Sequence, residues 1–145
     1  MQRVASQLTI PVFGSGDCVE PDQIVDRMRG GVEGVLVGRG VLRNPWILAQ
    51  AEDLAAGRPA RTVTMEDRAR FLLDYIDLLL SERVDEARVQ SHDRWVVNKL
   101  RALGSYYTKG LDNGSHLRTA INTASSLAQL RDIILTFFAA APART

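Results

Sequence analysis

Two short apolar runs in the first fifty residues constrain the fold most, because each is followed by a glycine-containing turn and then by a helix-like segment. The first run covers residues 8–13 and ends at the turn 14–17, and the second covers residues 35–37 and ends at the turn 38–40. Apolar strands that alternate with helices predict parallel strands buried on both faces.

The two helices expected after these turns have recognisable ends. Pro21 can begin the first helix and Gly30 can end it. The apolar side of this helix is expected to comprise Ile24, Val25 and Met28. The second helix is predicted to begin at Asn44, as an N-cap before Pro45, and to end near Ala56.

A sheet of only two strands has both faces and both edges open, and it is marginal in water. We therefore expect the first part of the chain to be the end of a larger α/β unit. The open strand edge at residues 8–13 or 35–37 also predicts self-association of the chain.

After residue 58 the sequence predicts helices only, so the fold expected is an α/β remnant in residues 1–58 followed by an all-α bundle in residues 59–145, mostly α overall. Capping residues and apolar stripes place four helices there, at about residues 64–84, 86–108, 115–121 and 126–138. The main core stripe predicted for the first comprises Phe71, Leu72, Tyr75, Leu78 and Leu79. For the second it comprises Val96, Leu100, Leu103 and Tyr107.

Charge and composition narrow the function classes. The whole chain has a net charge of +1, yet residues 87–120 carry six basic and two acidic side chains. Such a segment is compatible with a surface that binds a polyanion, but on charge alone a solvated helix face is the favoured interpretation. The lone Cys18 and two distant surface histidines, His92 and His116, offer no metal cluster. No stretch is long and apolar enough for a membrane span or a signal peptide, which predicts a cytoplasmic protein without a membrane partner.

The two glycine turns can bind phosphate. Glycine lets backbone N–H groups approach a ligand oxygen, and the start of the following helix adds a favourable dipole. Two consecutive turns of this kind after the last two strands of a (β/α)₈ barrel form a phosphate site, to which Arg39 can add a charged hydrogen bond. For either turn alone, a tight connection between a strand and a helix is the favoured explanation, and the repeat of the same layout reverses that preference.

These segments resemble the end of the flavin-dependent tRNA-dihydrouridine synthases. The resemblance lies in IPVFGSGD, in GVEGVLVGRGVLRNPWIL with its GRG-x-x-x-NPW signature, and in NKLRALGSYYTKGLDNGSHLRTAIN. It covers residues 8–138 in the right order. The last of these segments is similar to the helical domain that follows the barrel in this family.

The resemblance implies that the two turns hold the phosphate of FMN. The residues implied in cofactor binding are Gly14, Ser15, Gly16, Asp17, Gly38, Arg39 and Gly40. Ser15 replaces the asparagine that is usual in the family, which keeps a small polar side chain but shortens its reach.

The resemblance also implies that the helical part grips tRNA. The candidates for phosphate contacts are Arg94, Lys99, Arg101, Lys109 and Arg118. Tyr106 and Tyr107 stand where the family has an aromatic pair, and core packing is favoured over base stacking for them. Ala102 and Leu103 replace a usual Lys-His.

The family's catalytic cysteine lies on a loop in the first half of the barrel, and no such segment is present in this sequence. Cys18 follows the first glycine turn instead, and we expect it to be buried or half-buried and to have no catalytic role. We thus expect the C-terminal portion of an enzyme that uses NADPH and FMN to reduce uridine in tRNA to 5,6-dihydrouridine, not catalytic by itself. The alternatives are a stand-alone helical RNA-binding module with a vestigial barrel remnant, and another phosphate-binding flavin barrel of the dihydroorotate dehydrogenase kind.

Overall fold

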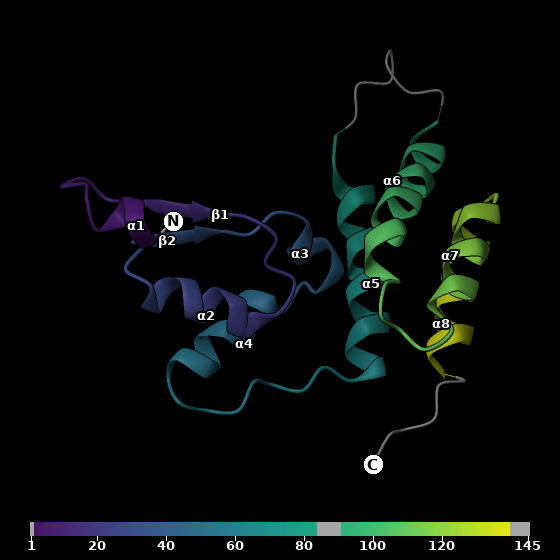
Figure 1. The fold of residues 1–145 in the computed structure, drawn as a ribbon. Coiled ribbons are helices and arrows are strands. Elements are labelled where there is room, and N and C mark those ends of the chain that lie inside the picture. Colours follow the sequence, from purple (N-terminus) through teal and green to yellow (C-terminus); the bar gives the residue numbers. More distant parts are fainter. Residues whose placement is uncertain (1, 84–90, 140–145) are drawn as a thin grey trace. The chain divides into compact units, whose positions relative to one another are not determined.

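The computed structural model describes residues 2–83 and 91–139, and it divides the chain into two compact units, residues 1–62 and residues 63–145 (Figure 1). The elements of the first unit are α1 (Gln2–Ala5), β1 (Phe13–Ser15), α2 (Pro21–Arg29), β2 (Gly34–Leu36), α3 (Arg39–Arg43) and α4 (Ile47–Ala55). Those of the second unit are α5 (Met65–Ser81), α6 (His92–Tyr107), α7 (Gly114–Thr123) and α8 (Leu127–Ala139). The expectation of a mostly helical chain with a small parallel sheet is confirmed.

The two strands pair in parallel, with Phe13 opposite Gly34 and Ser15 opposite Leu36. The first strand is shorter and begins later than predicted, since residues 8–12 lie outside it. The reason is the length of its partner: β2 begins at Gly34, and the backbone N–H of Glu33 donates to the Val12 carbonyl just before the ladder starts (2.8 Å). Residues before Val12 thus have no ladder partner within the described chain.

One face of this sheet is covered and the other is open. Figure 1 shows α2 and α4 on the same side of β1 and β2. The core on that side comprises Cys18, Ile24, Val25, Ile47 and Ala51, with Val35, Val37, Val41 and Leu54 packed against it. On the opposite face, Phe13 and Leu36 are each 60% exposed. The prediction of strands buried on both faces is therefore wrong for the described residues.

The helices of the first unit follow the sequence signals with two corrections. Helix α2 begins at Pro21 as predicted, but Met28, expected in its apolar side, is 44% exposed. The helix predicted at 44–56 begins later: Asn44 ends the short helix α3, and α4 begins at Ile47, although the Asn44 side chain accepts from the Trp46 N–H (3.3 Å) as predicted for a cap. Pro45 explains the break, because it lacks an N–H and disfavours helical backbone at the preceding residue.

A buried carboxylate holds the segment after α4. Asp53 is 6% exposed, and its oxygens accept hydrogen bonds from Arg58 (2.9 Å) and from Nε (2.8 Å) and the backbone N–H (3.2 Å) of Arg61. These donors, the Arg61 side chain first, hold the pKa of the Asp53 carboxyl well below its ordinary range.

We expect Asp53→Asn to lower the melting temperature of the first unit at neutral pH. Because the folded state lowers this pKa, the stabilisation is complete above the ordinary aspartate pKa and is lost as the pH falls below it. The difference between wild type and variant should therefore shrink as the pH is lowered from about 5 towards about 2. Trp46 fluorescence in a Trp95→Phe background reports this unfolding. Asp26→Asn, which removes an exposed pair with Arg29, is the control and should have little effect at any pH.

The second unit is a bundle of α5, α6, α7 and α8 (Figure 1). Thr64 and Asp67 form the predicted capping box at the start of α5, and Ser126 accepts from the Gln129 N–H at the start of α8. The core stripe predicted for α6 is buried throughout, as expected. On α5 the centre of the stripe is Ile76, whereas Leu78, expected inside, is 59% exposed.

Several helix ends differ from the prediction. Helix α5 ends at Ser81, and the expected ends at 84 and 86 lie outside the described residues. Helix α7 starts one residue earlier and ends two residues later than predicted. His92, expected at the surface, is half-buried with a ring nitrogen 3.1 Å from the Leu79 carbonyl oxygen. Across residues 2–83 and 91–139, no helix has the length and apolar character that a membrane span requires.

Candidate functional site

A cavity of about 240 Å³ lies where the turns after β1 and β2 meet, at the carboxyl ends of the two strands. Six of the seven residues proposed for cofactor binding line it, together with Cys18: Ser15, Gly16, Asp17, Gly38, Arg39 and Gly40. The seventh, Gly14, lies inside β1 and does not line the cavity. The structure thus brings two turns from distant parts of the sequence to one place, and their role in binding a cofactor stays a prediction.

The two turns touch through their backbones. A Cβ atom on Gly40 would lie 1.9 Å from the carbonyl oxygen of Cys18, so no larger residue fits there without moving one of the turns. The first turn is itself closed by a hydrogen bond from the Cys18 N–H to the Gly16 carbonyl (2.8 Å). The absence of a side chain at Gly40 thus sets the distance between the two turns that line the cavity.

The charges at the cavity are one guanidinium and one carboxylate. Arg39 donates to Asp17 across the two turns (2.8 Å), and both side chains are mostly exposed. An exposed pair of this kind is weak, with a net value of about 0–1 kcal/mol. A phosphate group can therefore compete with Asp17 for Arg39, and would meet repulsion from the carboxylate as it does so.

Two residues at this site have roles that the sequence did not indicate. Cys18 is buried, as expected, but it also lines the cavity. Arg27 reaches from α2 to the same turn, with one guanidinium nitrogen 2.7 Å from the Cys18 sulfur and beside Gly16. No local sequence signal connects Arg27 with the turn, since the contact depends on how α2 packs against the sheet. The described residues hold no group of His, Cys, Asp and Glu suited to a metal ion.

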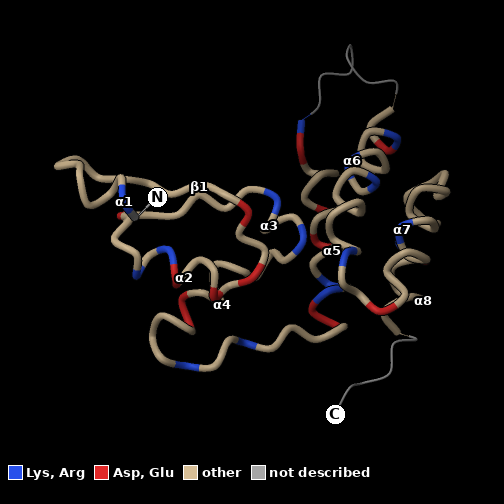
Figure 2. The backbone as a smooth tube through the Cα atoms, viewed as in Figure 1, with Lys and Arg blue, Asp and Glu red and all other residues tan. Residues whose placement is uncertain are grey.

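The predicted RNA-binding residues lie on α6 and α7 and just after α6 (Figure 2). Four of them have exposed side chains: Arg94, Lys99, Lys109 and Arg118. Arg101 is half-buried, and its guanidinium donates to the Ala124 carbonyl at the end of α7 (2.9 Å) and to Asn98 (3.2 Å). Arg101 thus links two helices of the bundle, and a contact with RNA stays a prediction for all five.

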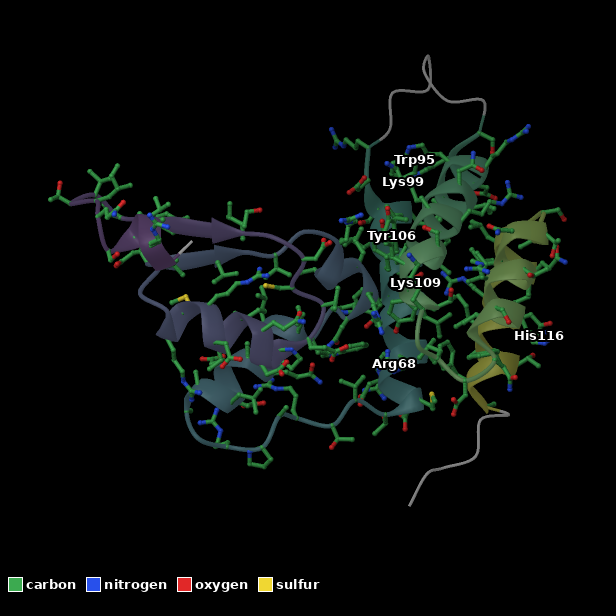
Figure 3. The ribbon with its side chains drawn as sticks, viewed as in Figure 1. Arg68, Trp95, Lys99, Tyr106, Lys109 and His116 are labelled. Carbon is green, nitrogen blue, oxygen red and sulfur yellow. The ribbon has the colours of Figure 1, made fainter. Side chains whose placement is uncertain are left out.

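The aromatic pair is divided between core and surface. Tyr107 is fully buried, and its hydroxyl donates to the Arg68 carbonyl (3.0 Å), so the preference for core packing is confirmed for this residue. Burial raises the pKa of the Tyr107 hydroxyl well above its usual range. Tyr106 is half-buried, and the Lys109 ammonium lies 5.1 Å from the centre of its ring (Figure 3). Lys99 lies over Trp95 in the same way, at 5.2 Å.

The sequence of this chain is similar to those of proteins in one family. The family described as "Dihydrouridine synthase (Dus)" matches residues 1–140. A probable tRNA-dihydrouridine synthase of Mycobacterium leprae is 29% identical over 84% of this chain and 30% of its own length. A tRNA-dihydrouridine(47) synthase of Coprinopsis cinerea is 29% identical over 70% of this chain and 15% of its own length. A probable tRNA-dihydrouridine synthase of Rickettsia bellii is 23% identical over 95% of this chain and 40% of its own length.

The chain therefore spans between 15 and 40% of the length of these relatives. The family match nevertheless extends over nearly all of this chain, and it includes both units, the glycine turns and the bundle. On this match the chain belongs to the dihydrouridine synthase family.

Proposed function

We propose that this chain is the C-terminal portion of an FMN-dependent tRNA-dihydrouridine synthase. Residues 1–58 supply the last two βα units of the barrel and the phosphate site of FMN, and residues 59–145 supply the helical tRNA-binding domain. The observation that carries this proposal is the cavity between the two turns, because six of the seven residues that the resemblance implies in cofactor binding line it. The complete enzyme reduces uridine in tRNA to 5,6-dihydrouridine at the expense of NADPH.

The open face of the sheet supports the barrel assignment. In a (β/α)₈ barrel one face of each strand meets the outer helices and the other points into the packed interior. Helices α2 and α4 cover one face here, and apolar Phe13 and Leu36 project from the other. This is the distribution expected for two neighbouring barrel strands whose inner face meets further strands.

The residues of the cavity fit a phosphate group. Gly16 and Gly38 are exposed and leave their backbone accessible, and the first N–H groups of a helix have no partner within that helix. Arg39 adds a guanidinium group, which can donate two parallel hydrogen bonds to a phosphate. FMN, when bound, supplies the hydride chemistry of the reaction. This chain's own residues bind and orient it, and we assign no catalytic acid to them.

Titration of the chain with FMN and with inorganic phosphate tests the proposal, followed by the backbone amide NMR signals of residues 15–17 and 38–40. Arg39→Gln should weaken binding of both ligands. Asp17→Asn should strengthen it by about fivefold, because it removes a carboxylate whose repulsion at about 4 Å in water is worth about 1 kcal/mol. Asp26→Asn removes an exposed carboxylate that does not line the cavity and should leave binding unchanged. Signals that stay unmoved at millimolar ligand would contradict the cofactor assignment.

A further inference from the structure

Four side chains follow one another along one side of α6 and its C-terminal end. Trp95, Lys99, Tyr106 and Lys109 are spaced by four, seven and three residues, which places them on one face of a helix. Figure 3 shows them in a row along α6. We call these four residues the aromatic–lysine stripe. Its two lysines are also among the five candidates for RNA phosphate contacts named from the sequence.

Each lysine of the stripe lies over a ring. The ammonium of Lys99 is 5.2 Å from the centre of Trp95, and that of Lys109 is 5.1 Å from the centre of Tyr106. The His92 ring, 5.7 Å away, supports Trp95 on α6. Both lysines are exposed, and neither forms an ion pair with any residue in 2–83 or 91–139.

Each lysine can give up its contact with the ring and form a contact with a ligand instead. An exposed cation–aromatic contact stabilises the folded chain only weakly. A lysine can leave the ring at that small cost and bind a phosphate, while the ring it covered becomes free to stack on a base. Each pair therefore presents the two groups that a nucleotide needs, a cation and an aromatic platform, at adjacent positions.

We propose that the aromatic–lysine stripe binds unpaired nucleotides of RNA, with Trp95 and Tyr106 stacking on bases and Lys99 and Lys109 bonding the adjacent phosphates. A paired RNA helix keeps its bases stacked inside, so aromatic platforms select loops and single strands over duplex. The inference rests on the proposed function, in which tRNA is the partner of the bundle. It adds that the contact is made with a loop or a single-stranded end of that tRNA.

The fluorescence of Trp95 tests stacking directly. The chain has two tryptophans, so Trp46→Phe leaves Trp95 as the sole emitter in an otherwise intact protein. A short oligouridine and a tRNA transcript should each quench its emission, and a blunt RNA duplex of the same length should do so only at much higher concentration. Emission that does not change while tRNA saturates the chain would overturn the proposal, as would equal quenching by the duplex.

Affinity measurements across a salt titration distinguish the contribution of the rings to tRNA binding from that of the lysines. Trp95→Leu should weaken tRNA binding about tenfold without changing the salt slope, and Trp95→Phe should restore most of the loss. Lys99→Ala combined with Lys109→Ala should lower the slope of log K against log salt by about 0.7 per lysine. Arg70→Ala removes an exposed cation of α5 that is paired with Glu66, and it is the charge control, expected to change neither quantity. Helical circular dichroism verifies that each variant is folded.

The outcomes for the stripe and for the proposed function can be told apart. If tRNA binds but Trp95→Leu and the double lysine variant behave as wild type, the stripe is not the contact, while the tRNA assignment stands. If the folded chain binds no tRNA, the assignment of the bundle as a tRNA-binding domain fails and the stripe proposal fails with it.

Discussion

Replacing Gly40 with alanine is expected to destabilise the first unit by about 3 kcal/mol, at the upper end of the cost of overpacking a core, and to abolish binding at the cavity. The new Cβ would lie 1.9 Å from the carbonyl oxygen of Cys18 and 3.1 Å from a methyl carbon of Val37. The first of these neighbours is backbone and cannot rotate away, so the two turns must separate. Denaturant unfolding followed by Trp46 emission, in a Trp95→Phe background, measures the stability. Titration with FMN measures the cavity.

Val41→Ala is the matched control for this substitution. Val41 is the next residue of α3 and packs against the core of the first unit, so its truncation costs about 1–2 kcal/mol through lost burial. It leaves the contact between Gly40 and Cys18 intact, and FMN should still bind. A Gly40→Ala variant as stable as wild type, or one that binds FMN equally well, would show that the two turns do not need this close approach.

Helix positions could be predicted because their signals are local. The capping box of Thr64 and Asp67 and the cap of Ser126 mark helix starts that depend only on the next few residues. The stripe of α6 from Val96 to Tyr107 repeats at helical spacing, and the structure buries all of it. Such features need no knowledge of the tertiary partner, and the starts of α5, α7 and α8 lie within about one residue of their predicted positions, inside the ordinary uncertainty of helix ends.

The predictions that were wrong concern features that depend on residues distant in the sequence. The first strand could not be placed from its own apolar residues, because its extent follows from where β2 begins. Leu78 has the spacing of a core residue on α5, yet the packing of the bundle leaves it outside. The open sheet face has the same cause: Phe13 and Leu36 are apolar, yet each remains 60% exposed, and the Phe13 ring lies against Gly34 of the neighbouring strand.

At the candidate site, too, some features could be predicted from local sequence and others could not. Glycine turns at the ends of neighbouring parallel strands must lie close together, so the sequence predicted most of the cavity lining. The pairing of Arg39 with Asp17 and the reach of Arg27 to the same turn depend on side-chain geometry across 22 and 9 residues, for which the sequence holds no signal. The inward hydrogen bond of Arg101 to Ala124 is of the same kind, and it distinguishes one basic residue of α6 from its exposed neighbours.

Gly114→Ala is the second substitution with a large expected effect, again about 3 kcal/mol, in the second unit. Gly114 begins α7 directly after Asn113, whose backbone is left-handed, with φ of 58°. A Cβ on Gly114 would lie 2.1 Å from the carbonyl oxygen of Thr108, so the turn that joins α6 to α7 would have to open. Trp95 emission in a Trp46→Phe background, or loss of helical circular dichroism, follows the unfolding of the bundle.

Gly104→Ala in the same bundle should have the opposite sign. Gly104 lies in the middle of α6, and a Cβ there would meet only the side chain of Ile121, at 3.5 Å, which is ordinary van der Waals contact. Alanine is favoured over glycine inside a helix by about 0.5–1 kcal/mol, so this variant should unfold at a slightly higher denaturant concentration than wild type. The two substitutions add the same methyl group to buried glycines on adjoining helices. If both destabilise the bundle equally, the close approach of Gly114 to Thr108 is not what fixes the turn, and the packing of α6 against α7 is tighter than the distance to Ile121 implies.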